Sequence, residues 1–384
     1  MVKLVTQAAR GQEGASGGEG AVREPGLVLG IETSCDETSA AVVAGGTRIF
    51  SNIIASQADL HRKYGGVVPE IASRKHLETF IPCVNEALEQ AGVGARDLDA
   101  VAVTCGPGLA GALLVGVAGG KALAYGAGLD LVGVNHLEGH IYANFLHAEA
   151  GPAPRGEQPH RLAETPGQAP EFPLVCLVVS GGHTDLILMK GHGSYEVLGR
   201  TRDDAAGEAF DKVARLMGLG YPGGPLVDSL AQKGDPDAVS LPKAHLEQGS
   251  LDTSFSGLKT AVAHVVRQGA YRPEDIAASF QKAVVSVLAE KAFSAVRRTG
   301  ARMLALAGGV SANSELRRTM LSAGERLGVP VRIPPPRLCT DNAAMVACAG
   351  YHGLVRGLRS GWDLNALPNL ALGDESIYLG AGGL

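Results

Sequence analysis

Two histidines, His136 and His140, stand four residues apart in an apolar stretch. On a helix, this spacing places both imidazole rings on one face, a single turn apart. Neutral imidazole is the commonest metal ligand among protein side chains. The pair therefore predicts two of the three protein ligands of a metal site with open coordination positions. Two helix histidines on a polar face, without a metal role, are the alternative that the spacing alone leaves open.

The glutamate between the histidines argues against a zinc peptidase. The peptidase motif H-E-x-x-H needs a glutamate directly after the first histidine, where it serves as the general base. Here Glu138 comes two positions after His136, which is roughly 200° around a helix. A glutamate in that direction does not easily reach water on the metal. A metallopeptidase is thus an alternative function that the motif disfavours.

The third metal ligand has to come from a distant part of the chain, and Asp341 is the best candidate. We expect a helix over Thr340–Val355 with Thr340 or Asp341 at its N-cap. The positive end of a helix would keep such a carboxylate ionised. Two histidines and a carboxylate suit iron(II) or zinc(II). An N-cap aspartate without a metal is one alternative, and three other histidines are candidate ligands, namely His61, His76 and His183.

Two β-hairpins are predicted, one at the start of each half of the chain. The first joins the apolar run Leu27–Ile31 to Ser39–Val43 through a polar turn. The second joins Leu174–Val179 to Leu186–Met189 through Ser180–Asp185. We therefore expect a duplicated α/β architecture. Helical periodicity is predicted for three segments: Leu60–Gly92, Asp275–Thr299 and, after the strand Met303–Ala307, Ser314–Leu327.

The glycine-rich tips that follow the strands indicate a nucleotide site. Glycines let backbone N–H groups approach phosphate oxygens closely. The two hairpin tips and Gly308-Gly309 would together surround a nucleotide in a cleft between lobes. Each tip alone is more often a simple turn. The carboxylate-rich segment Asp203–Lys212 and the turn Tyr221–Gly224 are further candidates. A solvated helix start is the alternative for the carboxylates.

Composition limits the class of protein. The chain has 384 residues, 45% of them hydrophobic, 4% aromatic, and a formal net charge of -5. This balance does not predict wholesale electrostatic binding of nucleic acid. Six scattered cysteines without C-x-x-C spacing indicate reduced thiols in a cytoplasmic protein. The uncharged run Val101–Gly120 is long enough to span a membrane. Because Cys105-Gly-Pro-Gly108 interrupts it, we expect a strand, a turn and a buried helix instead, and no membrane.

Eight motifs together resemble the tRNA adenosine threonylcarbamoyltransferase family (TsaD), whose members were once described as O-sialoglycoprotein endopeptidases. The resemblance runs in order from about Leu27 to about Leu358. The motifs are Gly30–Thr38, His136–His140, Val179–His183, Asp203–Lys212, Tyr221–Gly224, Phe255–Lys259, Gly308–Asn313 and Cys339–Asn342.

The resemblance implies an α/β fold of two duplicated lobes of the actin/hexokinase/Hsp70 ATPase type, with an interlobe cleft. It also implies transfer of the L-threonylcarbamoyl group from threonylcarbamoyl-adenylate. The acceptor is the exocyclic amine of the adenosine 3′ of the anticodon, in tRNAs that read codons beginning with A. The expected organisation is a disordered extension (1–26), a first lobe (27–147), a Pro/Gly-rich insertion (148–172), a second lobe (173–338), and a C-terminal helix and tail that return to the first lobe (339–384).

The resemblance also assigns roles residue by residue. It implies that one divalent metal, iron(II) first and zinc(II) second, is held by His136, His140 and Asp341. The adenylate, or ATP, would be held by Val179, Ser180, Gly181, Gly182, His183, Asp211, Gly224, Asp228 and Asn313. The implied partners are the tRNA anticodon loop, a paralogous non-catalytic subunit and a small ATPase subunit.

No activated serine or cysteine is required, because a mixed carbamoyl-phosphate anhydride is already reactive and needs chiefly to be oriented. Three carboxylates are candidates for positioning the amine or removing its proton, namely Asp36, Glu37 and Asp211. A non-catalytic nucleotide-binding module related to sugar kinases or chaperones is a further alternative. The histidine pair argues against it, since such folds typically use magnesium with carboxylates.

Overall fold

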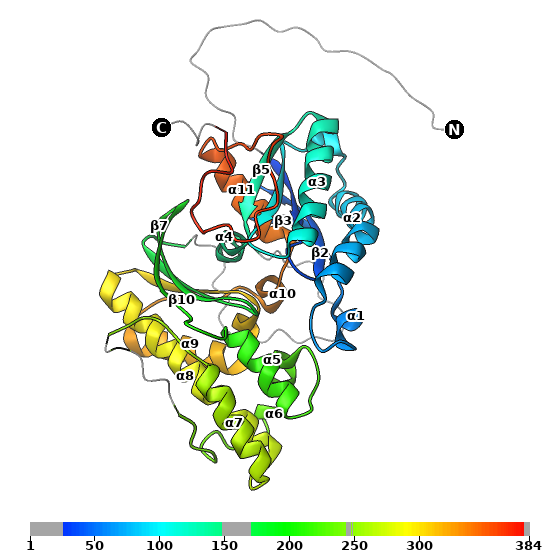
Figure 1. Ribbon diagram of the computed structural model, residues 1–384. Coiled ribbons are helices and arrows are strands. Elements are labelled where there is room, and N and C mark those ends of the chain that lie inside the picture. The colour runs from blue at the N-terminus through cyan, green and yellow to red at the C-terminus, as the bar shows by residue number, and fades with distance from the viewer. Residues whose placement is uncertain (1–25, 148–169, 243–246, 248, 380–384) are drawn as a thin grey trace, which may run out of the picture.

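The computed structural model describes residues 26–147, 170–242, 247 and 249–379 (Figure 1). The predicted extension at 1–26 therefore falls outside the described residues, apart from residue 26. The predicted insertion at 148–172 also falls outside them, apart from 170–172.

Two five-stranded sheets form the framework, and they repeat one topology. The first has the order β3-β2-β1-β4-β5 and the second the order β10-β9-β6-β7-β8. In each sheet the first three strands along the chain are antiparallel, and the last two add parallel to the first strand. The duplicated α/β architecture is thereby confirmed. The strands are β1 (Leu27–Glu32), β2 (Glu37–Ala44), β3 (Arg48–Ser56), β4 (Ala100–Gly106), β5 (Asp130–Asn135), β6 (Leu174–Val179), β7 (Thr184–Gly191), β8 (Ser194–Arg200), β9 (Met303–Ala307) and β10 (Val331–Arg332).

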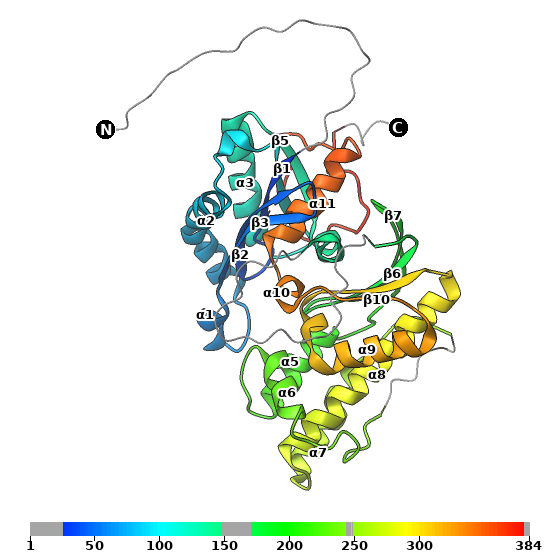
Figure 2. The same cartoon turned by 180° about the vertical axis from the view of Figure 1, so that it is seen from behind.

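The helices form three layers around the two sheets (Figures 1 and 2). The outer face of the first sheet is covered by α2 (Pro69–Ala91) and α3 (Ala110–Ala127). Between the sheets lie α4 (His136–Tyr142) and α11 (Ala343–Val355), and α4 contacts both sheets. On the outer side of the second sheet lie α5 (Ala206–Leu216), α6 (Gly223–Ala231), α7 (Ser256–Gln268), α8 (Pro273–Thr299) and α9 (Ser314–Leu327), of which α8 and α9 contact the strands. The shorter helices are α1 (Ala58–Arg62), α10 (Pro336–Cys339), and the 3-10 turns η1 (Ala95–Asp97), η2 (Ala143–Phe145) and η3 (Gly309–Ala312).

Strand alternation explains why the second sheet can be covered on both faces. Along β6, Val175, Leu177 and Val179 face the outer helices, while Leu174, Cys176 and Val178 face the inner layer. Successive side chains of a strand point to opposite faces. A continuous apolar run therefore suits a strand that is buried on both sides.

Two expectations for the first lobe meet different outcomes. The run Val101–Gly120 is divided as predicted, because β4 ends at Gly106 and α3 begins at Ala110. Within the described part of the chain, α3 is the one helix long and apolar enough to cross a membrane by length and composition; it packs against β4 and α2. The periodicity over Leu60–Gly92 instead belongs to two helices, α1 and α2. The chain breaks between them because Gly65 has a positive φ and Pro69 begins α2.

Small residues let α11 lie directly on the first sheet. A Cβ atom added at Gly30 of β1 would lie 2.1 Å from the carbonyl oxygen of Ala343 and 2.7 Å from the backbone nitrogen of Ala347. A Cβ added at Gly350 of α11 would lie 2.3 Å from the Cβ of Ala102 in β4. Only a hydrogen atom fits at these two glycine positions, so α11 packs directly against the backbone of the sheet.

We predict that Gly30→Ala lowers the free energy of unfolding by about 3 kcal/mol, because the new methyl group meets backbone atoms that have no room to move. Urea unfolding followed by circular dichroism measures this. Gly126→Ala is the matched control, since nothing lies within 4 Å of a Cβ at this α3 position. It should raise the free energy of unfolding by about 0.5 kcal/mol, because alanine lowers the conformational entropy of the unfolded chain. Equal stability of the two variants would contradict the packing argument.

Candidate functional site

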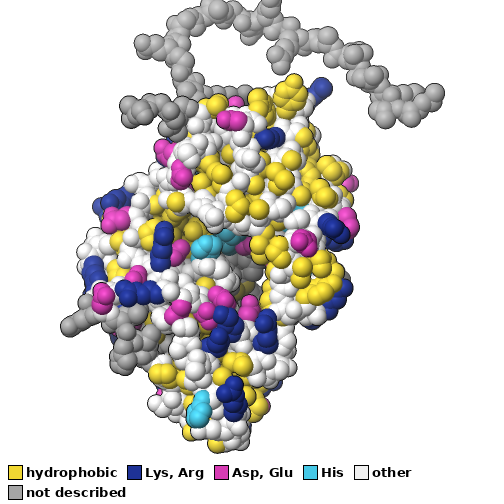
Figure 3. All heavy atoms as spheres, in the orientation of Figure 1, with side chains coloured by type: hydrophobic (Ala, Val, Ile, Leu, Met, Phe, Trp, Pro, Cys, Tyr) yellow, Lys and Arg dark blue, Asp and Glu magenta, His cyan; other side chains and the backbone are white. Residues whose placement is uncertain are grey.

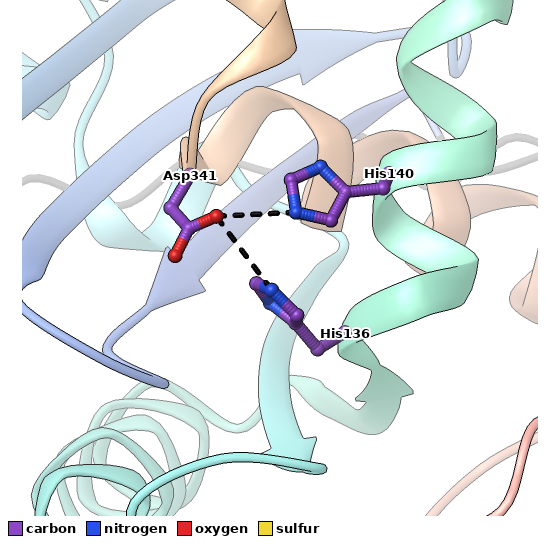
Figure 4. Close-up of side chains that lie close together, drawn as sticks. All are labelled: His136, His140 and Asp341. Atoms are coloured by element: carbon purple, nitrogen blue, oxygen red, sulfur yellow. Dashed lines mark ion pairs between the residues drawn. The ribbon is translucent and has the colours of Figure 1, made fainter. Parts of the chain in front are cut away.

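Helix α4 presents His136 and His140 on one face, as the spacing predicts (Figure 4). Asn135 caps the helix, since its side chain accepts hydrogen bonds from the backbone nitrogens of Leu137 at 2.9 Å and Glu138 at 3.4 Å. The two imidazole ring centres are 4.6 Å apart. Both rings are buried, and both turn toward the carboxylate of Asp341.

Asp341 faces these histidines. Its Oδ1 lies 3.1 Å from Nε2 of His140 and 3.6 Å from Nε2 of His136. Burial by itself would raise the pKa of Asp341, but the charges of His136 and His140 outweigh burial and lower the pKa to about 2. The carboxylate is therefore ionised throughout the physiological range.

The predicted N-cap of the late helix is wrong. Helix α11 begins at Ala343, and the side chain of Asn342 accepts a hydrogen bond from the backbone nitrogen of Met345 at 3.1 Å. Asparagine is among the strongest N-cap residues, and here it takes the place expected for Thr340 or Asp341. Because Asn342 caps the helix, the carboxylate of Asp341 is free to face the histidines.

The three side chains fit a metal ion. Among the described residues, His136, His140 and Asp341 form the one group of this kind whose ligand atoms all lie within 4.8 Å of one another. Both ring nitrogens of His140 are buried without a well-aligned hydrogen bond in the described structure. A buried polar atom without a partner is destabilising, and a metal ion would satisfy one of the two nitrogens. Three ligands of this type leave coordination positions open.

The electrostatics of the site favour a cation. Burial would lower the pKa of His136, but the negative charges of Asp341 and Glu32 outweigh burial and raise the pKa to about 9. The pocket thus stabilises positive charge, whether it is a proton or a metal ion.

The other candidate histidines are engaged elsewhere. His61 contacts Gln57 and the backbone nitrogen of Val68, each at 3.3 Å. His76 contacts the hydroxyl of Thr38 at 2.8 Å and the carbonyl oxygen of Cys35 at 3.0 Å. These partners occupy both nitrogens of each ring.

His183 belongs to the second lobe but lies within electrostatic reach of the triad. Burial, together with the positive charges of His136 and His140, lowers the pKa of His183 to about 4. Its imidazole is therefore neutral at pH 7. It stands outside the group formed by His136, His140 and Asp341.

Glu138 points away from the candidate metal site. It is half-buried, and its Oε1 accepts a hydrogen bond from the hydroxyl of Tyr195 in β8 at 2.7 Å. The glutamate of the histidine motif therefore links α4 to the second lobe. It is not directed at a ligand on the metal, as a peptidase base would have to be.

The glycine tip of the second hairpin is open. Val179 ends β6, and the turn is closed by the backbone nitrogen of Ser180, which donates to the carbonyl oxygen of His183 at 2.9 Å. Gly181 and Gly182 are exposed, and nothing lies within 4 Å of a Cβ built on either. The loop after β9 lies beside this tip, because a Cβ on Gly308 would meet the carbonyl oxygen of Val179 at 2.4 Å.

Three of the predicted adenylate ligands also hold the second lobe together. Asp211 accepts a hydrogen bond from the backbone nitrogen of Gly223 at 2.7 Å. Asp228 accepts from the backbone nitrogen of Ser314 at 3.0 Å and from its hydroxyl at 2.7 Å. Asn313 caps α9 and donates to Gln281 at 2.8 Å. Gly224, in the first turn of α6, has open space around its Cβ position.

A cavity of about 250 Å³ bridges the lobes, and one face of the molecule is hollowed between them, with histidine side chains visible there (Figure 3). The first lobe contributes Arg62, whose Nε donates to the carbonyl oxygen of Tyr221 at 3.3 Å. Arg215 reaches back from the second lobe to the carbonyl oxygen of Gly65. The cavity is lined by Arg62, Gly65, Asp211, Arg215, Gly218, Gly220 and Tyr221.

Of the three candidate catalytic carboxylates, Asp211 lines this cavity. Burial and the charges of Asp341 and Asp36 raise the pKa of Glu37 to about 9, so Glu37 is neutral at pH 7. Burial raises the pKa of Asp211. Burial and the charges of Asp36 and Asp211 raise the pKa of Tyr221. Asp36 and Asp211 are therefore both near enough to Tyr221, which lines the cavity, to influence its pKa.

The carboxylate-rich segment Asp203–Lys212 is mostly structural. Asp203 accepts hydrogen bonds from the backbone nitrogens of Phe255 and Ser256 at the start of α7. Lys212 pairs with Asp204 at 2.7 Å and Glu208 at 2.8 Å. Of the segment, Asp211 is the member that lines the cavity.

Sequence reasoning missed Glu32. This residue ends β1, is fully buried, and has its Oε2 3.1 Å from Nδ1 of His136. An ionisable residue inside an otherwise apolar strand was the signal available, since glutamate is rarely buried without a partner.

Comparison with known proteins agrees with this geometry. The sequence profile of tRNA N6-adenosine threonylcarbamoyltransferase (TsaD) matches residues 48–156 and 158–348. The protein of that description from Symbiobacterium thermophilum is 60% identical, over 91% of this chain and 97% of its own length. The one from Desulfitobacterium hafniense is 53% identical, over 90% of this chain and 97% of its own length.

Among solved structures, HypF of T. kodakarensis superposes with a TM-score of 0.55 at 15% identity, covering 87% of this chain and 48% of HypF. A full-length HypF in a phosphate- and nucleotide-bound form gives a TM-score of 0.52 at 14% identity, covering 86% of this chain and 46% of that one. At such identity the likeness concerns the fold, which is the two-lobed actin/hexokinase/Hsp70 ATPase type. Because the profile and the relatives cover most of its length, the chain belongs to the tRNA N6-adenosine threonylcarbamoyltransferase family.

Proposed function

We propose that this chain transfers the L-threonylcarbamoyl group from threonylcarbamoyl-adenylate to the exocyclic N6 amine of the adenosine 3′ of the anticodon, in tRNAs that read codons beginning with A. One observation carries the proposal beyond family membership. Helix α4, which carries His136 and His140 of the group formed with Asp341, contacts β6 and β9, the two strands that end at the glycine-rich loops of the second lobe. A metal site and an adenylate site would thus meet at the lobe junction.

The second lobe would bind the adenylate. Gly181 and Gly182 are exposed, and nothing lies within 4 Å of a Cβ built on either, so a phosphate would have room to approach their backbone N–H groups. Val179, Ser180 and His183 complete this loop. Asp211, Gly224, Asp228 and Asn313 would hold the nucleoside part, and several of them are kept in place by the hydrogen bonds described above. Holding the anhydride in one orientation is a large part of the rate enhancement that such a reaction needs.

The metal would be held by His136, His140 and Asp341, and we propose iron(II) first and zinc(II) second, since both accept two imidazoles and a carboxylate. When bound, it would supply Lewis-acid polarisation and a template for substrate oxygens. The protein's own contribution is a buried pocket with an ionised carboxylate, because the pKa of Asp341 lies near 2 in the field of the histidines.

The amine of the incoming adenosine needs a proton acceptor as the new bond forms. Glu37 is protonated at pH 7, since burial and the neighbouring carboxylates raise its pKa to about 9. It can donate a hydrogen bond to substrate but cannot take up a proton at that pH. We therefore assign acceptance or positioning of the amine to Asp36 and Asp211, which both act on Tyr221 beside the cavity.

The substrates imply partners and a compartment. The target base must leave its stack in the anticodon loop to reach the cleft, and a single-stranded loop makes that inexpensive. With a net charge of -5, the isolated chain should hold tRNA weakly. We propose that a paralogous non-catalytic subunit and a small ATPase subunit assist it, in the cytoplasm. A peptidase is not favoured, because Glu138 is bonded to Tyr195.

Activity is tested by supplying threonylcarbamoyl-adenylate and unmodified tRNA, with and without the partner subunits, and by quantifying threonylcarbamoyladenosine by mass spectrometry. We expect product that depends on the adenylate and increases with the partners. His140→Ala should lower its formation by at least about 100-fold. His264→Ala, at an exposed α7 position, should leave it unchanged. Cleavage of a glycoprotein substrate without any modified nucleoside would contradict the proposal.

Metal binding gives a second prediction. His140→Ala should lose stoichiometric metal and the His136→Ala/His140→Ala variant should lose it completely, because one carboxylate does not hold a divalent ion in this geometry. Elemental analysis of protein purified under identical conditions measures this, with circular dichroism to verify folding. His264→Ala should keep the wild-type metal content. Full occupancy in the double variant would refute the assignment of the site.

A third prediction concerns the adenylate. Gly182→Val should fold normally, since the added atoms enter open space. The side chain should push phosphate away from the backbone donors and weaken adenylate binding by about 1–3 kcal/mol. Isothermal titration calorimetry measures the affinity. Gly191→Val is the matched control at the other end of β7, where a Cβ also meets nothing within 4 Å. Unchanged affinity in Gly182→Val would refute phosphate binding at this tip.

A further inference from the structure

A second glutamate lies near the histidine pair, and unlike Glu138 it contacts a candidate metal ligand. Glu32 ends β1 and its side chain has no solvent exposure. Its Oε2 lies 3.1 Å from Nδ1 of His136. This is the ring nitrogen remote from Asp341, because Nε2 is the atom that faces that carboxylate.

The carboxylate of Glu32 is itself held in place. The hydroxyl of Thr104 in β4 donates to Oε2 at 2.7 Å, and the backbone nitrogen of Ser34 donates to Oε1 at 2.5 Å. Strand β4 and the turn after β1 thus hold the acceptor next to the histidine of α4. Ser34 also places its hydroxyl oxygen 3.1 Å from Nδ1 of His136.

We propose that Glu32 is a positioning residue for the metal site, acting through His136. By accepting a hydrogen bond from Nδ1–H, the carboxylate selects the tautomer whose Nε2 lone pair faces Asp341, and it holds the ring in that orientation. Its negative charge also increases the basicity of Nε2, which strengthens the bond to a metal. The inference rests on the metal site proposed above.

The two histidines are consequently not equivalent. His140 has no corresponding acceptor, since its Nδ1 is buried without a hydrogen bond in the described structure. Apart from the contact of its Nε2 with Asp341, its ring is held by packing. We therefore expect removal of Glu32 to act on one ligand and to leave the other unaffected.

The first experiment compares three variants in a competition assay with a chromogenic chelator and Zn²⁺. Glu32→Ala should weaken Zn²⁺ binding about 10- to 100-fold. Glu32→Gln should weaken it less, because the amide oxygen can still accept from Nδ1–H. Ser34→Ala is the matched control, as it removes a neutral oxygen at the same distance from the same nitrogen. Its effect should be about threefold, as for one uncharged hydrogen bond.

The second experiment tests whether Glu32 acts through His136. Glu32→Ala is placed in the His136→Ala and in the His140→Ala backgrounds, and Zn²⁺ affinity is measured by calorimetry at raised metal concentration. With His136 absent, removal of Glu32 should cause no further loss. With His140 absent, it should cause the same 10- to 100-fold loss as in the wild type. In the Co²⁺-loaded protein, Glu32→Gln should shift the visible absorption bands.

The outcomes separate this inference from the proposed function. An equal loss in both backgrounds would mean that Glu32 only supports the fold, and it would overturn the proposed role. Unchanged Zn²⁺ affinity in Glu32→Ala, with both histidine variants weakened, would overturn the role of Glu32 but leave the metal site intact. Unchanged affinity in His136→Ala and His140→Ala would overturn both.

Discussion

The direct contact of α11 with the first sheet is the constraint on which the site depends. Helix α11 follows the second lobe in the chain, yet it lies on β1 and beside α4. Hydrogen at Gly30 and Gly350 in place of a side chain allows this approach. The start of α11 is thereby held next to α4, and Asp341, two residues before the helix, meets the histidines. A methyl group at either glycine would displace α11 from the sheet and move the carboxylate of Asp341 away from the histidines.

Burial gives the charges in this layer their effect. Glu32, Asp341 and Glu37 lie close enough that each acts on the pKa of His136. They end in different states, because Asp341 is ionised against the histidines while Glu37 is neutral at pH 7. In water these charges would interact weakly, but inside a protein the interaction is several times stronger. Two carboxylates with similar pKa values in water therefore differ in protonation at pH 7, because their surroundings in the inner layer differ.

The two lobes meet through polar contacts at opposite sides of the site. Tyr195 in β8 donates to Glu138 in α4. Near the cavity, Arg62 donates to the carbonyl oxygen of Tyr221, and Arg215 donates to that of Gly65. These contacts orient the second-lobe loops relative to the histidines. Glu138, which stands between the two histidines in the sequence, therefore links the lobes by a hydrogen bond.

The amino-acid sequence by itself determined the local elements and the family. Strands β6 and β9 and helix α9 have the predicted bounds, because apolar runs that end at glycine or polar turns are signals contained within a few residues. The pairing of His136 with His140 follows from helical spacing in the same way. Gly65 and Pro69 also mark the break between α1 and α2 in the sequence, but the helical periodicity continues across it and predicts a single helix.

Only the tertiary structure decided what depends on distant residues. Asn342 rather than Asp341 caps α11, since the choice between adjacent cap residues depends on where each side chain finds a partner. Glu32 lies 104 residues before His136, and no spacing rule connects positions so far apart. The neutral state of Glu37 arises from burial and from Asp341. Burial and long-range charge are properties of the packed chain, so a local pattern does not contain them.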